Sequence, residues 1–178
     1  MRPPILFLTV GLPGCGKTTA ARRFEVEHAA LRLTKDEWMK ALYGAENPPS
    51  ASDVIEGRLI AIALRAVNLG INVALDFGLW SRDERSALRH AGNEAGACVV
   101  LWYAPISLAE QRRRHANRLE TDPQGTWPIS DEELTTWSTW FNEPTPGELD
   151  GVEPLDPPPA GFTTWHEWMQ QRWPASTT

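Results

Sequence analysis

The chain has 178 residues, a net charge of −6 and two cysteines. This length suits one domain with a buried core, and so few cysteines exclude a disulfide-stapled scaffold. The apolar run at 5–10 is far shorter than the ~20 residues that span a bilayer, and nothing near it resembles a signal peptide. We therefore expect one cytoplasmic domain over residues 1–178, with no membrane contact.

The charge is distributed unevenly along the chain. Up to Leu119 there are 16 basic and 12 acidic residues, whereas from Glu120 onward there are 11 acidic residues and one basic residue, Arg172. The first part suits a bound polyphosphate, and the acidic remainder would repel a long nucleic acid. An acidic surface that only maintains solubility explains the second part equally well.

Apolar runs and helix-start signals alternate along the chain. Four apolar runs predict strands at 5–10, 30–33, 71–76 and 97–103. Apolar periodicity and capping-box patterns predict helices at about 16–28, 34–43, 53–69, 81–94, 107–119, 130–142 and 164–173. Strands separated by such helices form a parallel sheet with helices on both faces, which binds ligands at the carboxyl ends of its strands.

Segments between these elements carry loop signals. Residues 47–50 and 121–128 are predicted loops. Residues 152–155 allow at most a poor edge strand, because Pro154 has no N–H to donate. Three consecutive prolines at 157–159 indicate a stiff spacer before the last helix.

The segment Gly11-Leu-Pro-Gly-Cys-Gly-Lys-Thr18 matches the pattern G-x-x-x-x-G-K-[ST] between a predicted strand and a predicted helix. Its glycines allow backbone conformations that turn N–H groups toward phosphate oxygens, and the helix N-terminus adds to this attraction. Lys17 can reach the β- and γ-phosphates, and the Thr18 hydroxyl can bind Mg²⁺. We predict a nucleoside triphosphate site made by Gly11, Pro13, Gly14, Cys15, Gly16, Lys17, Thr18 and Thr19.

Two aspartates follow predicted strands at the same edge of the sheet. Asp76 ends a buried apolar run, where a carboxylate would hold Mg²⁺ directly or through water. Asp36 lies in the first turn of a predicted helix, where a carboxylate can accept the proton of an attacking hydroxyl. The alternatives are a turn-capping role for Asp76 and a helix-dipole role for Asp36. The neighbouring Glu37 is explained by a capping box with Thr34.

Arginines and tryptophans supply further candidates. Arg114 and Arg118 are four residues apart on a predicted helix, so they share a face and can reach the same anion on a lid over the phosphates. A solvated basic face is the alternative. One of Arg82, Arg85 and Arg89 could touch a substrate. Most of the nine tryptophans are expected to pack in the core, and three lie near crevice elements and could face a ligand: Trp38, Trp80 and Trp137.

These motifs together resemble the small P-loop kinases often called AAA-type ATP-binding proteins, whose relatives include chloramphenicol phosphotransferase, the kinase domain of polynucleotide kinase, zeta toxins and gluconate kinase. The resemblance covers about residues 3–155. It rests on the loop at 11–19, Asp36-Glu37, Asp76, Arg114-x-x-x-Arg118 and the stretch Phe141–Glu148. It implies a P-loop NTPase three-layer α/β sandwich with sheet order 2-3-1-4-5, a helical lid at about 107–128, and a Trp-rich C-terminal extension at about 157–178 outside the family pattern.

The resemblance also implies roles for individual residues. Asp36 is the general base, Lys17, Arg114 and Arg118 assist catalysis, and Thr18 and Asp76 hold Mg²⁺. The expected activity is ATP-dependent transfer of the γ-phosphate to a hydroxyl of a small molecule, such as a sugar, nucleoside or antibiotic. A polynucleotide 5′-hydroxyl kinase is the first alternative, weakened because Met39 replaces the arginine that those enzymes carry three residues after the base. A nucleotide-gated module whose Trp-rich tail meets a protein partner is the second.

Overall fold

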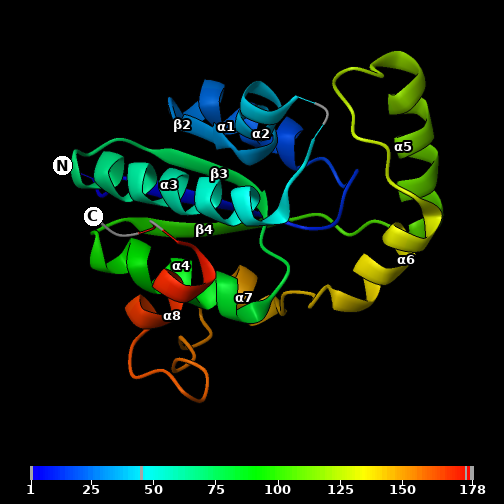
Figure 1. Ribbon diagram of the computed structural model, residues 1–178. Coiled ribbons are helices and arrows are strands. Elements are labelled where there is room, and N and C mark those ends of the chain that lie inside the picture. Colours follow the sequence, from blue (N-terminus) through cyan, green and yellow to red (C-terminus); the bar gives the residue numbers. More distant parts are fainter. Residues whose placement is uncertain (1, 45, 175, 177–178) are drawn as a thin grey trace.

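A parallel sheet of four strands forms the centre of the molecule (Figure 1). The computed structural model describes residues 2–44, 46–174 and 176. The strands are β1 (Ile5–Val10), β2 (Leu31–Thr34), β3 (Val73–Gly78) and β4 (Cys98–Tyr103). Their order is β2-β3-β1-β4. The four predicted strands are confirmed, and their order agrees with 2-3-1-4. The described residues form no fifth strand, so that part of the expected order has no counterpart there.

Eight helices surround the sheet within the described residues. They are α1 (Lys17–His28), α2 (Lys35–Tyr43), α3 (Pro49–Asn68), α4 (Arg82–Glu94), α5 (Leu108–Thr121), α6 (Asp131–Trp140), α7 (Pro146–Leu149) and α8 (Trp165–Arg172). None of the helices in the described part of the chain is both long enough and apolar enough to cross a bilayer.

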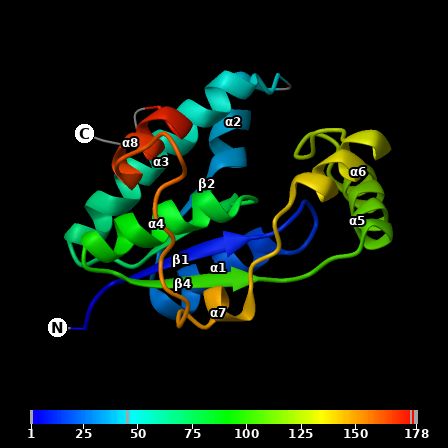
Figure 2. The ribbon, with the colours of Figure 1, turned by 90° about the horizontal axis from the view of Figure 1, so that it is seen from below.

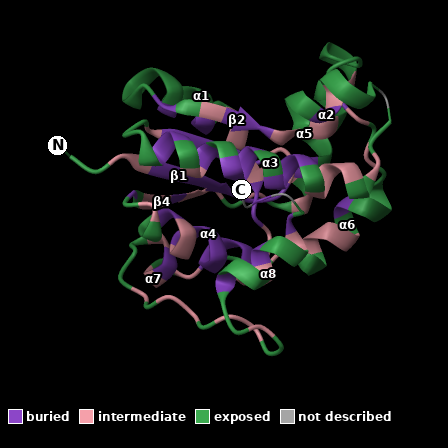
Figure 3. Ribbon diagram, turned by 60° about the vertical axis from the view of Figure 1, so that its left-hand side comes forward, coloured by how far each residue is buried: buried purple, intermediate pink, exposed green. Residues whose placement is uncertain are grey.

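Successive side chains of β1 point to opposite faces of the sheet, as the two-residue period of a strand requires. Leu6 and Leu8 pack in the larger core with Leu59 of α3 and other residues of α3 and α4. Phe7 packs on the other face, where it stacks on Phe24 of α1 with ring centroids 4.2 Å apart. Helices therefore cover both faces (Figures 2 and 3), and the three-layer α/β sandwich is confirmed.

Helices α5 and α6 contact each other beyond the carboxyl end of the sheet, set apart from the other helices (Figure 2). The chain enters α5 from the end of β4 and returns from α6 to α7, which contacts β4. A Cβ built on Gly14 would lie 3.7 Å from the Cβ of Arg114, so α5 also approaches the phosphate loop. The helix pair therefore lies beside the phosphate loop, at the position expected for a lid.

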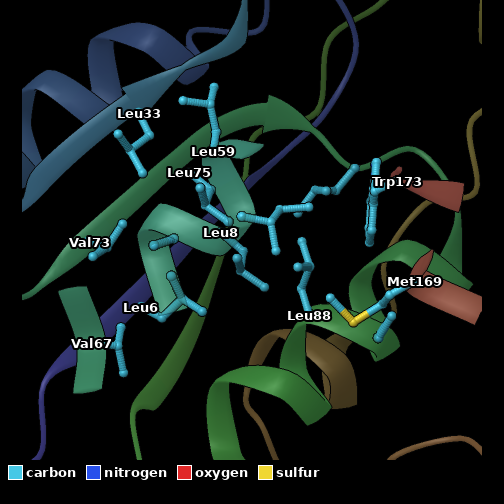
Figure 4. Packing of buried hydrophobic residues seen from close by; sticks show 14 of the residues in the cluster. Leu6, Leu8, Leu33, Leu59, Val67, Val73, Leu75, Leu88, Met169 and Trp173 are labelled. Atoms are coloured by element: carbon cyan, nitrogen blue, oxygen red, sulfur yellow. The ribbon is translucent and has the colours of Figure 1, made fainter. Parts of the chain in front are cut away.

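Residues 157–174 make up the C-terminal segment, whose helix α8 packs against α4 (Figures 1 and 4) and whose Met169 and Trp173 join the larger core. Trp173 is fully buried and Trp165 is 3% exposed. The ring of Trp168 meets both of them edge-on, with centroids 5.6 Å apart in each case. A Cβ on Gly57 would lie 2.1 Å from the carbonyl oxygen of Pro174, so the segment touches the α3 backbone itself. These apolar side chains therefore fill part of the core of this chain.

Three of the predicted capping boxes are confirmed, one is only half formed and the one at Thr34 is wrong. Ser81, Ser130 and Thr164 form the predicted capping boxes of α4, α6 and α8. Ser107 accepts only the backbone N–H of Glu110, because the Glu110 carboxylate binds arginines instead. The box predicted at Thr34 is wrong: its hydroxyl makes no cap and bonds elsewhere.

One helix start, one helix and one possible strand also differ from expectation. α3 begins at Pro49, four residues before the predicted start, because proline is well suited to the first helical turn. Asp53 therefore lies inside the helix, where it pairs with Arg172. α7 was not predicted, although Thr145 forms a capping box there. The edge strand considered at 152–155 is absent, and this stretch is irregular.

Candidate functional site

The phosphate loop follows β1 and leads directly into α1, as its sequence predicts. Gly14 and Gly16 have φ values of 81° and 99°, which other residues rarely adopt. The Lys17 ammonium donates hydrogen bonds to the carbonyl oxygens of Gly11 and Leu12, each at 2.9 Å. Cys15, which belongs to the loop, has a buried side chain, and its sulfur lies 3.8 Å from the Lys17 nitrogen. The lysine therefore bonds the carbonyl groups of its own loop.

Asp76 lies within β3 beside this loop and is 5% exposed. The Thr34 hydroxyl donates to its carboxylate at 3.2 Å, which explains why Thr34 does not cap α2. Burial raises the pKa of Asp76, and a hydrogen bond with Thr18 and the charge of Lys17 oppose that rise. A carboxylate and a hydroxyl next to a phosphate cradle are the oxygen ligands that Mg²⁺ takes in nucleotide sites, so these residues fit that ion.

Asp36 lies in the first turn of α2, and its side chain is 68% exposed. The Lys35 ammonium is 4.0 Å from its carboxylate and 3.3 Å from that of Glu56. Glu56 in turn accepts a 2.8 Å hydrogen bond from the indole of Trp173. The neighbour Glu37 pairs with Arg32 at 2.8 Å. Of the two acids in this turn, Asp36 is therefore the one that is free to meet a ligand.

A cavity of about 480 Å³ joins these groups. Its walls come from the phosphate loop, α2, the end of β3, α5, residues 125–129 and α6. Lys17, Thr18, Asp36 and Asp76 all line it. The size lies within the ~300–1,000 Å³ typical of small-ligand sites. All of the predicted nucleotide, metal and base residues except Gly11 and Cys15 therefore line one cavity.

The two candidate lid arginines occupy different surroundings. Arg118 lines the cavity, next to His115. Arg114 does not line it: its guanidinium donates to the carbonyl of Gly14 at 2.9 Å and to Glu110 at 2.6 Å. Burial and the charge of Arg118 lower the pKa of His115, which accepts a 3.0 Å hydrogen bond from the Ile129 N–H. Arg114 therefore ties α5 to the phosphate loop, and Arg118 faces the ligand space.

The arginines of α4 lie outside the cavity. Arg85 is fully buried and binds both carboxylate oxygens of Glu148, at 2.8 and 3.1 Å. It also donates to the carbonyl of Asn142 at 2.8 Å. Arg82 pairs with Glu153 and Asp156, and Arg89 donates to the Glu153 carbonyl. They hold the chain after α6 against α4, and the expectation of a substrate contact among them is wrong for this structure.

Aromatic side chains complete the cavity wall. Trp80 and Trp137 line it, as the sequence suggested, with ring centroids 5.6 Å apart. Trp38 is 45% exposed and does not line it. Sequence reasoning missed Trp127, whose ring lies 4.7 Å below the Lys40 ammonium. The sequence of the loop at 121–128 did not indicate that Trp127 lines the cavity. Its contact with Lys40 joins segments more than 80 residues apart in the chain.

Comparisons with known proteins identify the family and the fold. A family model described as AAA domain matches residues 6–144. No curated protein sequence matches the chain. The chain is similar to a structure of the Pnkp1/Rnl/Hen1 RNA repair complex, with a TM-score of 0.66 and 22% identity over 85% of this chain and 46% of that one. It therefore spans less than half of that relative's length.

Two further structures match over nearly their whole length. Kti12 from Chaetomium thermophilum, in complex with ADP-AlF3, has a TM-score of 0.63 and 16% identity, covering 97% of this chain and 100% of that one. A gluconokinase from Sinorhizobium meliloti 1021 has a TM-score of 0.57 and 14% identity, covering 99% and 93%. At these identities the likeness shows a shared P-loop fold. Since the family model covers well over half of the sequence, the chain belongs to the AAA domain family of small P-loop proteins.

Proposed function

We propose that this protein is an ATP-dependent kinase that transfers the γ-phosphate to a hydroxyl of a small molecule. One observation carries the proposal. The phosphate loop and Asp36, an exposed carboxylate that makes no helix cap and whose ion-pair partner Lys35 is 4.0 Å away, line the same cavity. A carboxylate in the cavity that holds the phosphate loop supports a role as the base that accepts the proton of an acceptor hydroxyl.

The chemistry follows from the groups in place. The acceptor oxygen attacks the γ-phosphorus, its proton passes to Asp36, and the bond to the β-phosphate oxygen breaks to release ADP. Lys17 leaves the carbonyl groups of Gly11 and Leu12 and bonds the β- and γ-phosphates. Arg118 offsets the charge on the transferred group. Thr18 and Asp76 would hold Mg²⁺, which neutralises phosphate charge when bound.

Replacement of the base tests this mechanism. We expect Asp36→Ala to lower acceptor-stimulated ADP release by roughly 100-fold or more while ATP affinity stays within about twofold, because general-base catalysis contributes about 10²–10⁴-fold. The assay is ADP release with a panel of sugars, nucleosides, aminoglycosides and short oligonucleotides. Asp83→Asn is the matched control, since Asp83 also lies in the first turn of a helix but outside the cavity. Unchanged turnover in Asp36→Ala would remove Asp36 from the mechanism.

A polynucleotide 5′-hydroxyl kinase is the second candidate, favoured by the likeness to the RNA repair complex. Against it, Met39 is fully buried in the core and does not line the cavity. This candidate predicts phosphate transfer to a short oligonucleotide and an affinity that falls steeply with salt. Absence of such transfer at low salt would eliminate it.

A further inference from the structure

Three indole rings, those of Trp80, Trp127 and Trp137, line the same cavity as Asp36, and the part of the cavity that they line is called its aromatic end. Trp80 follows β3, and Trp137 belongs to α6. Their rings are 5.6 Å apart and inclined at 47°. Trp80 is fixed in place, because its indole N–H donates to the Gly11 carbonyl at 3.2 Å and its own carbonyl accepts from the Asn142 N–H at 2.9 Å. The phosphate loop and the aromatic wall are thus joined rigidly.

Residues 125–129 also line the cavity. Lys40 of α2 lies 4.7 Å from the Trp127 ring centroid and donates to the Gln124 carbonyl at 2.7 Å. These contacts connect α2 to the segment before α6 and bring Trp127 to the cavity. The Lys40 ammonium is therefore already bonded and does not serve as a free cation for a ligand.

Two polar atoms in this wall are buried and have no partner among the described residues. They are the Thr126 hydroxyl and the Trp127 indole nitrogen. Thr126 is 8% exposed, and both residues line the cavity. A buried polar group without a hydrogen bond costs roughly 1–3 kcal/mol, so such groups normally meet a partner. Both atoms have almost no exposed surface, so a ligand hydroxyl would reach them only after the two side chains turn toward the cavity. A hydroxyl that donates and accepts, beside an indole that donates, would then match the hydroxyl groups of a ligand.

We propose that this end of the cavity binds a neutral hydroxylated ring, either a free monosaccharide or the ribose of a nucleoside, as the phosphate acceptor. The inference rests on the proposed kinase function. The apolar face of the ring would lie against Trp80 and Trp137, and its hydroxyl groups would bond Thr126 and Trp127. A further hydroxyl would then face Asp36.

The charges nearby favour a neutral ring over an anionic one. Lys35 pairs with the buried Glu56, and Lys40 bonds Gln124 and covers Trp127. The carboxylates of Asp36 and Glu133 also line the cavity. Lys17 and Arg118 are left for the triphosphate. Among the described residues at this end, a carboxylate on the acceptor would therefore find no uncommitted lysine or arginine.

Binding is measured separately from turnover. The full chain, saturated with a non-hydrolysable ATP analogue and Mg²⁺, is titrated by calorimetry with D-glucose, D-ribose, adenosine and D-gluconate. We expect the neutral rings to bind at least tenfold more tightly than D-gluconate. Monosaccharide binding would identify a free sugar as the source of the ring, and binding of adenosine alone would identify a nucleoside. Tighter binding of the anion, or no binding of any neutral ring, would overturn the inference.

Two variants with matched controls locate the ring. Thr126→Val keeps the shape but removes the unpartnered hydroxyl, and should weaken ring binding about tenfold, equivalent to one hydrogen bond. Its control is Thr135→Val on the exposed side of α6. Trp137→Ala should weaken binding at least tenfold, whereas Trp140→Ala on the same helix, 64% exposed, should not. Unchanged ring affinity in Thr126→Val and Trp137→Ala would refute the location.

The two proposals fail in different ways. If a neutral ring binds but no ADP forms, the kinase function is wrong and the ring site stands. If ADP forms only with acyclic or anionic acceptors, the kinase stands and the ring site is wrong.

Discussion

Trp173 donates its indole N–H to the carboxylate of Glu56 at 2.8 Å, across 117 residues of sequence. Glu56 also faces Lys35 at 3.3 Å, and Lys35 lies next to Asp36. Burial raises the pKa of Glu56, and the charges of Lys35 and Arg172 oppose that rise. The C-terminal segment is thus linked to the candidate base through one buried carboxylate.

Trp173→Phe tests this link. The change keeps an aromatic ring in the core but leaves a Glu56 oxygen without its donor. We expect the free energy of unfolding to fall by about 1–3 kcal/mol, measured by urea denaturation. Trp140→Phe, at an exposed position, is the control and should change stability by less than about 0.5 kcal/mol. Equal stability of the two variants would show that the hydrogen bond contributes nothing.

Breaking the buried ion pair of Arg85 and Glu148 should lower stability more than Trp173→Phe does. Both side chains are at most 1% exposed. Arg85→Met leaves the buried Glu148 carboxylate with only the more distant Arg82, at 3.8 Å, as a cationic partner, and we expect a loss of about 3 kcal/mol in unfolding free energy.

The double variant Arg85→Met/Glu148→Met is the control for this pair. Because it removes both charges, it should recover much of the stability lost in the single variant. A double variant as unstable as the single one would mean that the other contacts of Arg85, such as the Asn142 carbonyl, carry the stabilisation.

Lys17→Met should weaken nucleotide binding. A charge-assisted hydrogen bond contributes about 1.5–3 kcal/mol, so the affinity for an ATP analogue with Mg²⁺ should fall roughly 10–150-fold in calorimetry. Arg23→Met on the exposed side of α1 is the control and should bind normally. Normal binding by Lys17→Met would contradict the assignment of this loop.

The raised pKa of Asp76 predicts that the free energy of unfolding depends on pH. Its pKa is raised in the folded protein, so folding favours its protonated form. The stability that protonated Asp76 contributes is fully present below the ordinary carboxyl pKa. It is lost as pH rises through the raised pKa. The unliganded wild type should therefore lose more unfolding free energy than Asp76→Asn between about pH 4 and pH 7. Parallel pH profiles of the two proteins would contradict the burial effect.

The sequence predicted the strands, the phosphate loop and most helix starts because each depends on residues close together in the chain. Predictions from the sequence failed where a residue far away in the chain competes with local groups for a side chain. Thr34 gives up its cap to bond Asp76, and Asp53 pairs with Arg172 instead of starting a helix. Trp127 and Thr126 reach the cavity only because α2 and the segment before α6 meet, which no local pattern records.

The contact between Gly57 and Pro174 has an evolutionary consequence. No side chain fits between the α3 backbone and that carbonyl oxygen, so any larger residue at position 57 must displace the backbone of Trp173 and Pro174. Among relatives, glycine at this position should therefore be inherited together with a C-terminal extension that closes over α3, and lost together with it.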